Sequence, residues 1–284
     1  MSSTACAQVN KSSFFGDLVL GETYCNEKFA IRDMPTAIFT IYTPQGWVIA
    51  ADGLGMLSDG SNPEYNTQKI FPIEGKSLAY TLFGSTKLFY QENRIDLGFE
   101  VANAVKALSS RNLCDSSLYL ERICGPLRKS LLKAKKQGLV LQGIEVPPEP
   151  GKTILWAFLI GYFDGKPTLA RCRIFHRNQK LAGISADIDP VKPGWSRRHG
   201  PEKVWDMLED PQDRTFETYK TALPTSGEIT LVQGIDSARN HIQACYDAKA
   251  REIDPVTCEK IGGHMHVATI TPERGFQWVE PPRS

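Results

Sequence analysis

Residues 35–86 constrain the fold of this chain more than any other stretch of its sequence. They begin with two apolar segments, 36–42 and 46–51, which are separated by a turn containing Pro44, Gln45 and Gly46. Two apolar runs joined by so short a turn predict a β-hairpin. Apolar side chains fall on both faces of the first segment, so we expect a sheet that is covered on both sides.

Three polar residues stand out against this apolar background. Thr36 opens the first predicted strand, Asp52 closes the second, and Lys69 begins a third strand in the segment TQKIF. Because neighbouring antiparallel strands have their ends close together, we expect these side chains to meet at one edge of the sheet. A hydroxyl held beside an ammonium and a carboxylate is a chemically sensible nucleophile site.

The next part of the chain predicts helices. Apolar residues recur at helical intervals at Leu97, Val101 and Val105, which favours a helix that could begin as early as residue 87, after a cap at Ser85-Thr86. Gly98 weakens the case for one unbroken helix. A second helix is predicted to start at residue 115 or 116.

Strands return after residue 150. The segments 153–163 and 168–175, separated by Asp164-Gly165, predict a hairpin, and a third strand is expected near 180–185. A short helix at 202–208 and a long one at 228–251 follow. The chain ends in a hairpin over 264–279, turned by residues 272–275.

This order of strands, two helices, strands, a helix and a hairpin predicts an α+β fold, with two sheets between helix layers. The stretch 187–226 is rich in proline, glycine, tryptophan and charge, and it is predicted to be an insertion. Within it, Trp195 and Trp205 are expected to be packing anchors. The run Arg197-Arg198-His199 is expected to be a solvated loop, with anion binding as the alternative.

Composition restricts the partners and the surroundings of the protein. The chain has 284 residues and a formal net charge of +1, so charge gives no reason to expect binding to nucleic acid or to an anionic membrane. No apolar run approaches the ~20 residues of a membrane span, and no secretory signal is evident. The seven cysteines are irregularly spaced, which favours reduced thiols in a soluble, cytoplasmic protein.

The polar residues of the first stretch carry a resemblance to proteasome subunits, which are N-terminal-nucleophile (Ntn) hydrolases. Thr36 lies sixteen residues before Asp52 of VIAAD, as in that family, and Lys69 fits the family lysine with a one-residue insertion. Gly84 lies where the family has the glycine whose N–H forms the oxyanion hole. The Gly262-Gly263 pair, followed by a strand, a turn and a strand, is similar to the end of those subunits.

The resemblance implies a four-layer αββα sandwich over residues 36–284. It also implies a threonine peptidase that cleaves peptide or amide bonds through Thr36, assisted by Asp52, Lys69 and Gly84. Neither a cofactor nor a metal is implied. Self-association is implied, with a ring as one form. Residues 1–35 are then either an N-terminal tail or a propeptide whose removal exposes Thr36.

Two departures from the family pattern keep other functions open. Pro35 stands where active subunits have the glycine that precedes the threonine, and its fixed φ disfavours self-cleavage. Cys258 and Ile261 replace an Asp and a Ser that support the threonine amine. One alternative is a non-catalytic structural or assembly subunit of the same fold. The other is an amidase that acts on a small molecule, with residues 187–226 covering its pocket.

His264 and His266 are two residues apart on a predicted strand and therefore share a face. Such a pair suits a metal ion, but no further ligand pair is near in sequence. We therefore expect two histidines on a strand face and no metal site.

Overall fold

The computed structural model describes residues 36–55, 63–84, 87–90, 93–109, 125, 129, 153–163, 165–177, 180–189, 191–221 and 228–283. The predicted tail or propeptide, and nearly all of the helix predicted after residue 115, lie outside these residues. The described part is a mixed α+β fold with two five-stranded antiparallel sheets and few helices.

The first sheet begins with the predicted hairpin, in which Ile38 pairs with Ala51 and Thr43 pairs with Gly46. Antiparallel partners flank this hairpin on both sides. In pairing order the strands are β10 (Ser196–His199), β1 (Ile38–Thr43), β2 (Gly46–Ala51), β11 (His266–Thr271) and β12 (Gly275–Glu280). The closing hairpin is therefore confirmed, and it lies directly beside the opening one.

The second sheet contains the third strand predicted at Lys69 and the predicted hairpin around Gly165. In pairing order its strands are β3 (Ile70–Pro72), β4 (Leu78–Gly84), β7 (Thr153–Phe163), β8 (Lys166–Arg177) and β9 (Lys180–Asp189). The strand expected at 180–185 is thus longer than predicted. A separate two-stranded ribbon consists of β5 (Lys87–Tyr90) and β6 (Asn93–Asp96).

This ribbon contradicts the helix predicted to begin at residue 87. Helix α1 spans only Leu97–Ser109, and Leu88 pairs with Ile95 across the ribbon. A short apolar run fits both a helical and a strand period. Here the antiparallel pairing of β5 with β6 decides in favour of strands. Gly98 therefore lies in the first turn of the helix and not in its middle.

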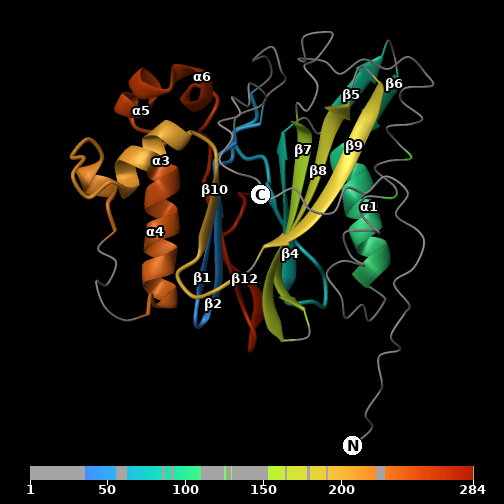
Figure 1. Cartoon of the computed structure of the whole chain (residues 1–284), viewed down its shortest axis with the longest axis horizontal. Helices are drawn as coiled ribbons and strands as arrows, with labels where there is room; N and C mark the ends of the chain where they lie inside the picture. Colours follow the sequence, from blue (N-terminus) through green and yellow to red (C-terminus); the bar gives the residue numbers. More distant parts are fainter. Residues whose placement is uncertain are drawn as a thin grey trace, which may run out of the picture.

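Helices cover one face of the first sheet (Figure 1). They are α3 (Glu202–Glu209), α4 (Leu231–Ala244), α5 (Ala248–Ile253) and α6 (Pro255–Cys258), with a 3₁₀ turn, η1, at Glu217–Tyr219. The helix predicted over 228–251 is therefore two helices. Asp247 separates them, because its carboxylate accepts the Lys249 N–H and starts α5.

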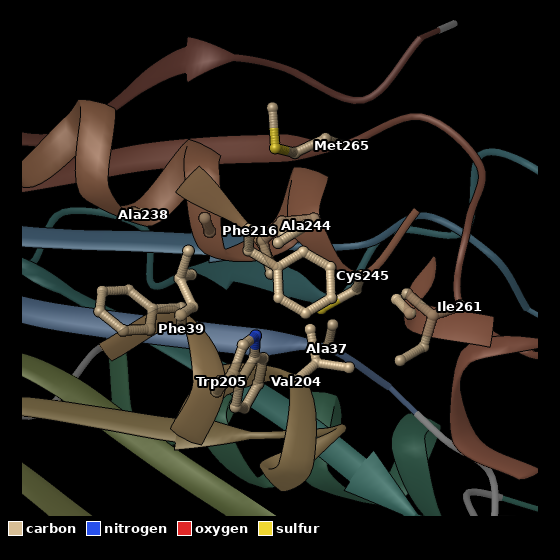
Figure 2. Packing of buried hydrophobic residues seen from close by; sticks show 14 of the residues in the cluster. Ala37, Phe39, Val204, Trp205, Phe216, Ala238, Ala244, Cys245, Ile261 and Met265 are labelled. Carbon is tan, nitrogen blue, oxygen red and sulfur yellow. The ribbon is translucent and has the colours of Figure 1, made fainter. Parts of the chain in front are cut away.

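Two hydrophobic clusters hold these sheets and helices together. One joins the first sheet to the helices, with Phe39, Trp205, Phe216 and Ile242 all at most 2% exposed (Figure 2). The other draws side chains from both sheets, among them Trp47 of β2 and Phe158 of β7. Trp205 packs in the first cluster and Trp195 packs against the second, so both are the packing anchors that the sequence predicted.

The segment predicted to be an insertion contributes regular structure to the fold. It provides β10, which pairs with β1, and α3, which matches the predicted short helix. The run Arg197-Arg198-His199 is a strand and not a solvated loop, so that prediction is wrong. The strand forms because its backbone completes the edge of the first sheet.

Replacing Thr230 with alanine should lower the free energy of unfolding by about 1 kcal/mol. Its hydroxyl accepts the Gln233 N–H while the Gln233 side chain accepts the Thr230 N–H, which is a capping box at the start of α4. Urea unfolding measures the change. Thr257→Ala is the control, because Asp254 supplies the acceptor for the α6 cap; its effect should stay within ~0.5 kcal/mol.

Candidate active site

Three of the predicted site residues meet where β1 begins and β2 ends, with Lys69 coming from the residue before β3. Lys69 Nζ lies 2.7 Å from Asp52 Oδ1 and 3.4 Å from Thr36 Oγ1. Asp52 is fully buried, and Thr36 and Lys69 are each 7% exposed. The predicted convergence of these side chains is therefore observed. Their roles in catalysis stay a prediction.

The carboxylate of Asp52 is held on both oxygens. Oδ1 accepts the Ala37 N–H at 2.9 Å, and Oδ2 accepts those of Leu54 and Gly262 at 3.2 and 3.4 Å. With Lys69, four donors surround one carboxylate, which is what a buried charge requires. The side chain thereby ties the start of β1, the end of β2 and the segment before β11 to one point.

Burial shifts the pKa values of both members of the ion pair, Asp52 and Lys69. It raises the pKa of the Asp52 carboxyl above its usual value, although the charge and the hydrogen bond of Lys69 act against this shift. It lowers the pKa of the Lys69 ammonium, with Asp52 acting in the opposite direction. A lysine of lowered pKa next to a hydroxyl is typical of sites where protons are moved.

Two glycines allow the backbone to come close beside Asp52. Gly263 has a φ of 73°, and a methyl group on it would lie 2.5 Å from the Tyr65 carbonyl oxygen. A methyl group on Gly53 would lie 2.2 Å from the His264 carbonyl oxygen. Only glycine permits this contact, which brings the Gly262 N–H to Asp52.

Gly84 ends β4 opposite Leu155, with a φ of 102°. Only a glycine adopts this backbone conformation readily. Residues 85–86, which follow it, lie outside the described residues. The contacts of the site described above involve Thr36, Asp52 and Lys69, and the role of Gly84 in an oxyanion hole stays a prediction.

Two of the three positions that depart from the family pattern belong to the core. Cys258 is fully buried and Ile261 is 2% exposed, and both belong to the cluster under the helices. Burial raises the pKa of the Cys258 thiol to about 12, so the thiol stays neutral. Cys245 and Cys258 are free thiols, as predicted for these two cysteines.

His199 is a partly buried side chain near Thr36 that no sequence pattern revealed. His199 lies opposite Ile38 on β1, and a methyl group on the next residue, Gly200, would lie 3.1 Å from the Thr36 carbonyl oxygen. Its ring packs 4.5 Å from that of Phe158 and 5.4 Å from that of Phe83. Its Nε2 atom is buried without a hydrogen-bond partner among the described residues.

Acid should destabilise the protein through His199. Burial, together with the charges of Arg197 and Arg171, lowers the pKa of His199 to about 3. A histidine in the unfolded chain takes up its proton near pH ~6.5. The contribution of neutral His199 to the free energy of unfolding is therefore fully present above that pH and is lost as the pH falls toward 3. At pH 5 the loss is on the order of 2 kcal/mol.

Thermal unfolding at pH 7.5 and pH 5.0 measures this loss. His199→Phe keeps an aromatic ring against Phe158 but removes the titration. The difference between the melting temperatures at the two pH values should therefore shrink. An unchanged gap in this variant would assign the acid sensitivity to other groups.

His264 and His266 have structural partners. The Nε2 atoms of the two rings contact the carbonyl oxygen of Pro281 at 2.9 Å and the Asn66 side-chain oxygen at 3.4 Å, respectively. Burial lowers the pKa of His266 to about 4. Among the described residues, no group of three potential ligands is arranged to hold a metal ion.

Beside this pair is an open cavity of about 430 Å³. Its lining residues are Tyr65, Asn66, Gly263, His264, Met265 and Arg283.

In the part of the chain that the structure describes, no helix has the length and apolar character needed to cross a membrane.

The sequence matches no protein-family model and no curated protein. A function for this chain is therefore inferred from the geometry of Thr36, Asp52 and Lys69.

Proposed function

We propose that this chain is a proteasome-like threonine hydrolase, in which Thr36 becomes the N-terminal nucleophile once residues 1–35 are removed. One observation carries the proposal: Lys69 Nζ contacts Thr36 Oγ1 at 3.4 Å and Asp52 Oδ1 at 2.7 Å. The substrate class is a peptide or another amide, and no cofactor is required.

A four-layer αββα arrangement is part of the same proposal. One hydrophobic cluster contains side chains of both sheets, and the other joins the first sheet to helices α3–α6. In Figure 1, α1 lies beyond the second sheet, on the side away from these helices. These observations support the layering, and self-association into a ring remains the expectation from the resemblance.

In the proposed reaction, Thr36 Oγ1 attacks the carbonyl carbon of the substrate. The hydroxyl proton passes to the free α-amine of Thr36, which titrates near pH ~7.7–8.0 and is therefore available as a base at neutral pH. The C–N bond then breaks, and the departing amine takes that proton. Water hydrolyses the resulting ester and restores the hydroxyl.

The surrounding groups have separate roles in this scheme. Lys69 donates to Thr36 Oγ1, which orients a lone pair of the oxygen and favours an unprotonated amine nearby. Asp52 fixes Lys69. The Gly84 N–H stabilises the oxyanion, a contribution of roughly 2.7–4 kcal/mol where single donors of this kind have been removed.

A non-catalytic subunit of the same fold is the second candidate. It is favoured by the burial of Cys258 and Ile261 in the core, since neither side chain can hold an amine as an Asp and a Ser would. Pro35 favours it as well, because it stands at the bond that would have to be cleaved. In this case the Lys69–Asp52 pair only ties strand ends together.

A β-lactone that acylates nucleophilic hydroxyls distinguishes the two candidates. The hydrolase should form one covalent adduct, which peptide mass mapping places on Thr36 Oγ1, and Thr36→Ala should form none. Thr40→Ala is the matched control, since Thr40 lies on the same strand and donates to the Arg197 carbonyl oxygen. An unmodified wild-type chain would favour the non-catalytic subunit.

A further inference from the structure

The segment that follows β12, residues 281–283, is held by hydrogen bonds from two side chains. The Arg283 N–H donates to Asn66 Oδ1 at 2.9 Å, and Asn66 Nδ2 donates to the Arg283 carbonyl oxygen. Two residues earlier, the Pro281 carbonyl oxygen lies 2.9 Å from His264 Nε2, which is the donor of that contact. We refer to Asn66 and His264 as the backbone clamp, because these hydrogen bonds all go to main-chain atoms of the segment.

The contacts of the backbone clamp follow the pattern by which one β-strand pairs with another. In an extended chain the N–H and C=O of a residue point to the same edge, and every second residue shares that edge. A side-chain amide offers one acceptor and one donor, as a peptide group does, so Asn66 takes the place of a partner strand opposite Arg283. Glu280 and Pro281 each precede a proline, which favours an extended backbone at both residues.

His266 sets the direction in which the Asn66 amide points. His266 is fully buried, and its Nε2 atom lies 3.4 Å from Asn66 Oδ1. Burial lowers the pKa of His266 to about 4, so the ring is neutral at neutral pH and has a single N–H. Placed on Nε2, this N–H donates to Asn66 Oδ1 and leaves Asn66 Nδ2 turned toward the Arg283 carbonyl oxygen. A buried group therefore orients the amide independently of the segment that it holds.

The segment itself is only lightly covered by the rest of the molecule. Pro281 and Arg283 are exposed, and Arg283 lines the open cavity of about 430 Å³ together with Tyr65 and Met265. Recognition therefore depends on main-chain hydrogen bonds, and the cavity leaves room for other side chains at this position. Because the entropy lost on ordering the segment offsets much of the gain from these hydrogen bonds, the segment can leave the clamp.

We infer that Asn66 and His264 form a binding site for an extended peptide, and that residues 281–283 are the occupant of this site within the chain. The ligand class is a peptide with proline at the position of Pro281, where an N–H would find no partner in the clamp, and with a free N–H at the position of Arg283. Side chains at the latter position are not selected, because they face the open cavity. The inference concerns main-chain recognition and does not depend on the proposed function.

A peptide added to the full-length protein tests the site after the chain's own segment has been weakened. Arg283→Pro removes the N–H that Asn66 Oδ1 accepts, and Arg283→Ala is the matched control because it keeps this N–H. The probe is an acetylated hexapeptide with the sequence of residues 279–284, and the ¹⁵N NMR signal of the His264 N–H reports its binding. The peptide should bind Arg283→Pro at least about tenfold more tightly than Arg283→Ala, since the intact segment competes at a high effective concentration.

Two further variants, each made in the Arg283→Pro protein, assign the binding to the clamp. Asn66→Ala removes both hydrogen-bond partners of residue 283, and His264→Phe removes the donor to the Pro281 carbonyl oxygen. Each should weaken binding of the peptide by about tenfold. A hexapeptide with proline in place of Arg283 should not bind, because it has no N–H for Asn66 Oδ1.

Absence of peptide binding to Arg283→Pro, or binding that Asn66→Ala and His264→Phe leave unchanged, would overturn the inference. Equal binding to Arg283→Pro and Arg283→Ala would overturn it as well, because residues 281–283 would then not occupy the site. None of these measurements uses hydrolysis. A protein that binds the peptide at the clamp but fails to react at Thr36 would contradict the proposed function alone.

Discussion

Replacing Asp52 with alanine should lower the free energy of unfolding by about 3–5 kcal/mol. Asp52 is fully buried, and its loss leaves the Lys69 ammonium without its ion-pair partner. It also leaves the buried N–H groups of Ala37, Leu54 and Gly262 without their acceptor. Unsatisfied buried donors retain their full desolvation cost, which is why the effect exceeds that of a surface ion pair.

Urea or thermal unfolding of the purified variant measures this change. Asp236→Ala is the matched control, because Asp236 is about half exposed and lies 3.7 Å from Arg239 in a surface pair. Its effect should stay below about 1 kcal/mol. If Asp52→Ala were as mild as this control, Asp52 would not be the point that joins the strand ends.

Thr36→Ala should abolish hydrolysis of peptide substrates while leaving the protein folded. Removal of a nucleophile leaves no route to the covalent intermediate, and losses on the order of 10⁶-fold in kcat are known for such changes. The stability cost should be about 1 kcal/mol or less, since Lys69 keeps its 2.7 Å contact with Asp52. Initial rates on a fluorogenic peptide library measure the loss.

Two variants separate the loss of the nucleophile from a general disturbance of β1. Thr36→Ser restores a hydroxyl at the same position and should recover part of the rate. Thr40→Ala removes another buried hydroxyl of the strand and should keep the wild-type rate. Activity at the wild-type level in Thr36→Ala would exclude Thr36 as the nucleophile.

The parts of the fold that sequence predicted well are local. Each hairpin has its turn within a few residues of both strands, as at Pro44-Gln45 and Gly165, so the pattern and the pairing coincide. The error at residues 87–96 arose because Leu88, Phe89 and Ile95 suit both periods, and only the pairing of β5 with β6 decides between them. Asp247 divided the last predicted helix by a cap that periodicity does not register.

The same difference between local patterns and distant contacts separates the site residues that were predicted from those that were missed. Thr36, Asp52 and Lys69 were predicted to meet because strand ends and a family spacing placed them together. His199 was missed as a neighbour of Thr36, since its ring contact with Phe158 joins residues that are far apart in the chain. No local pattern marks such a histidine, and only the pairing of β10 with β1 shows that it matters for Thr36.

The most direct test of the central claim is the intact mass and the N-terminal sequence of the purified protein. The proposed hydrolase needs the free α-amine of Thr36, so the mature chain should begin at Thr36. A mature chain that retains Pro35, or any residue before it, would contradict the account and identify the protein as a non-catalytic relative of the fold.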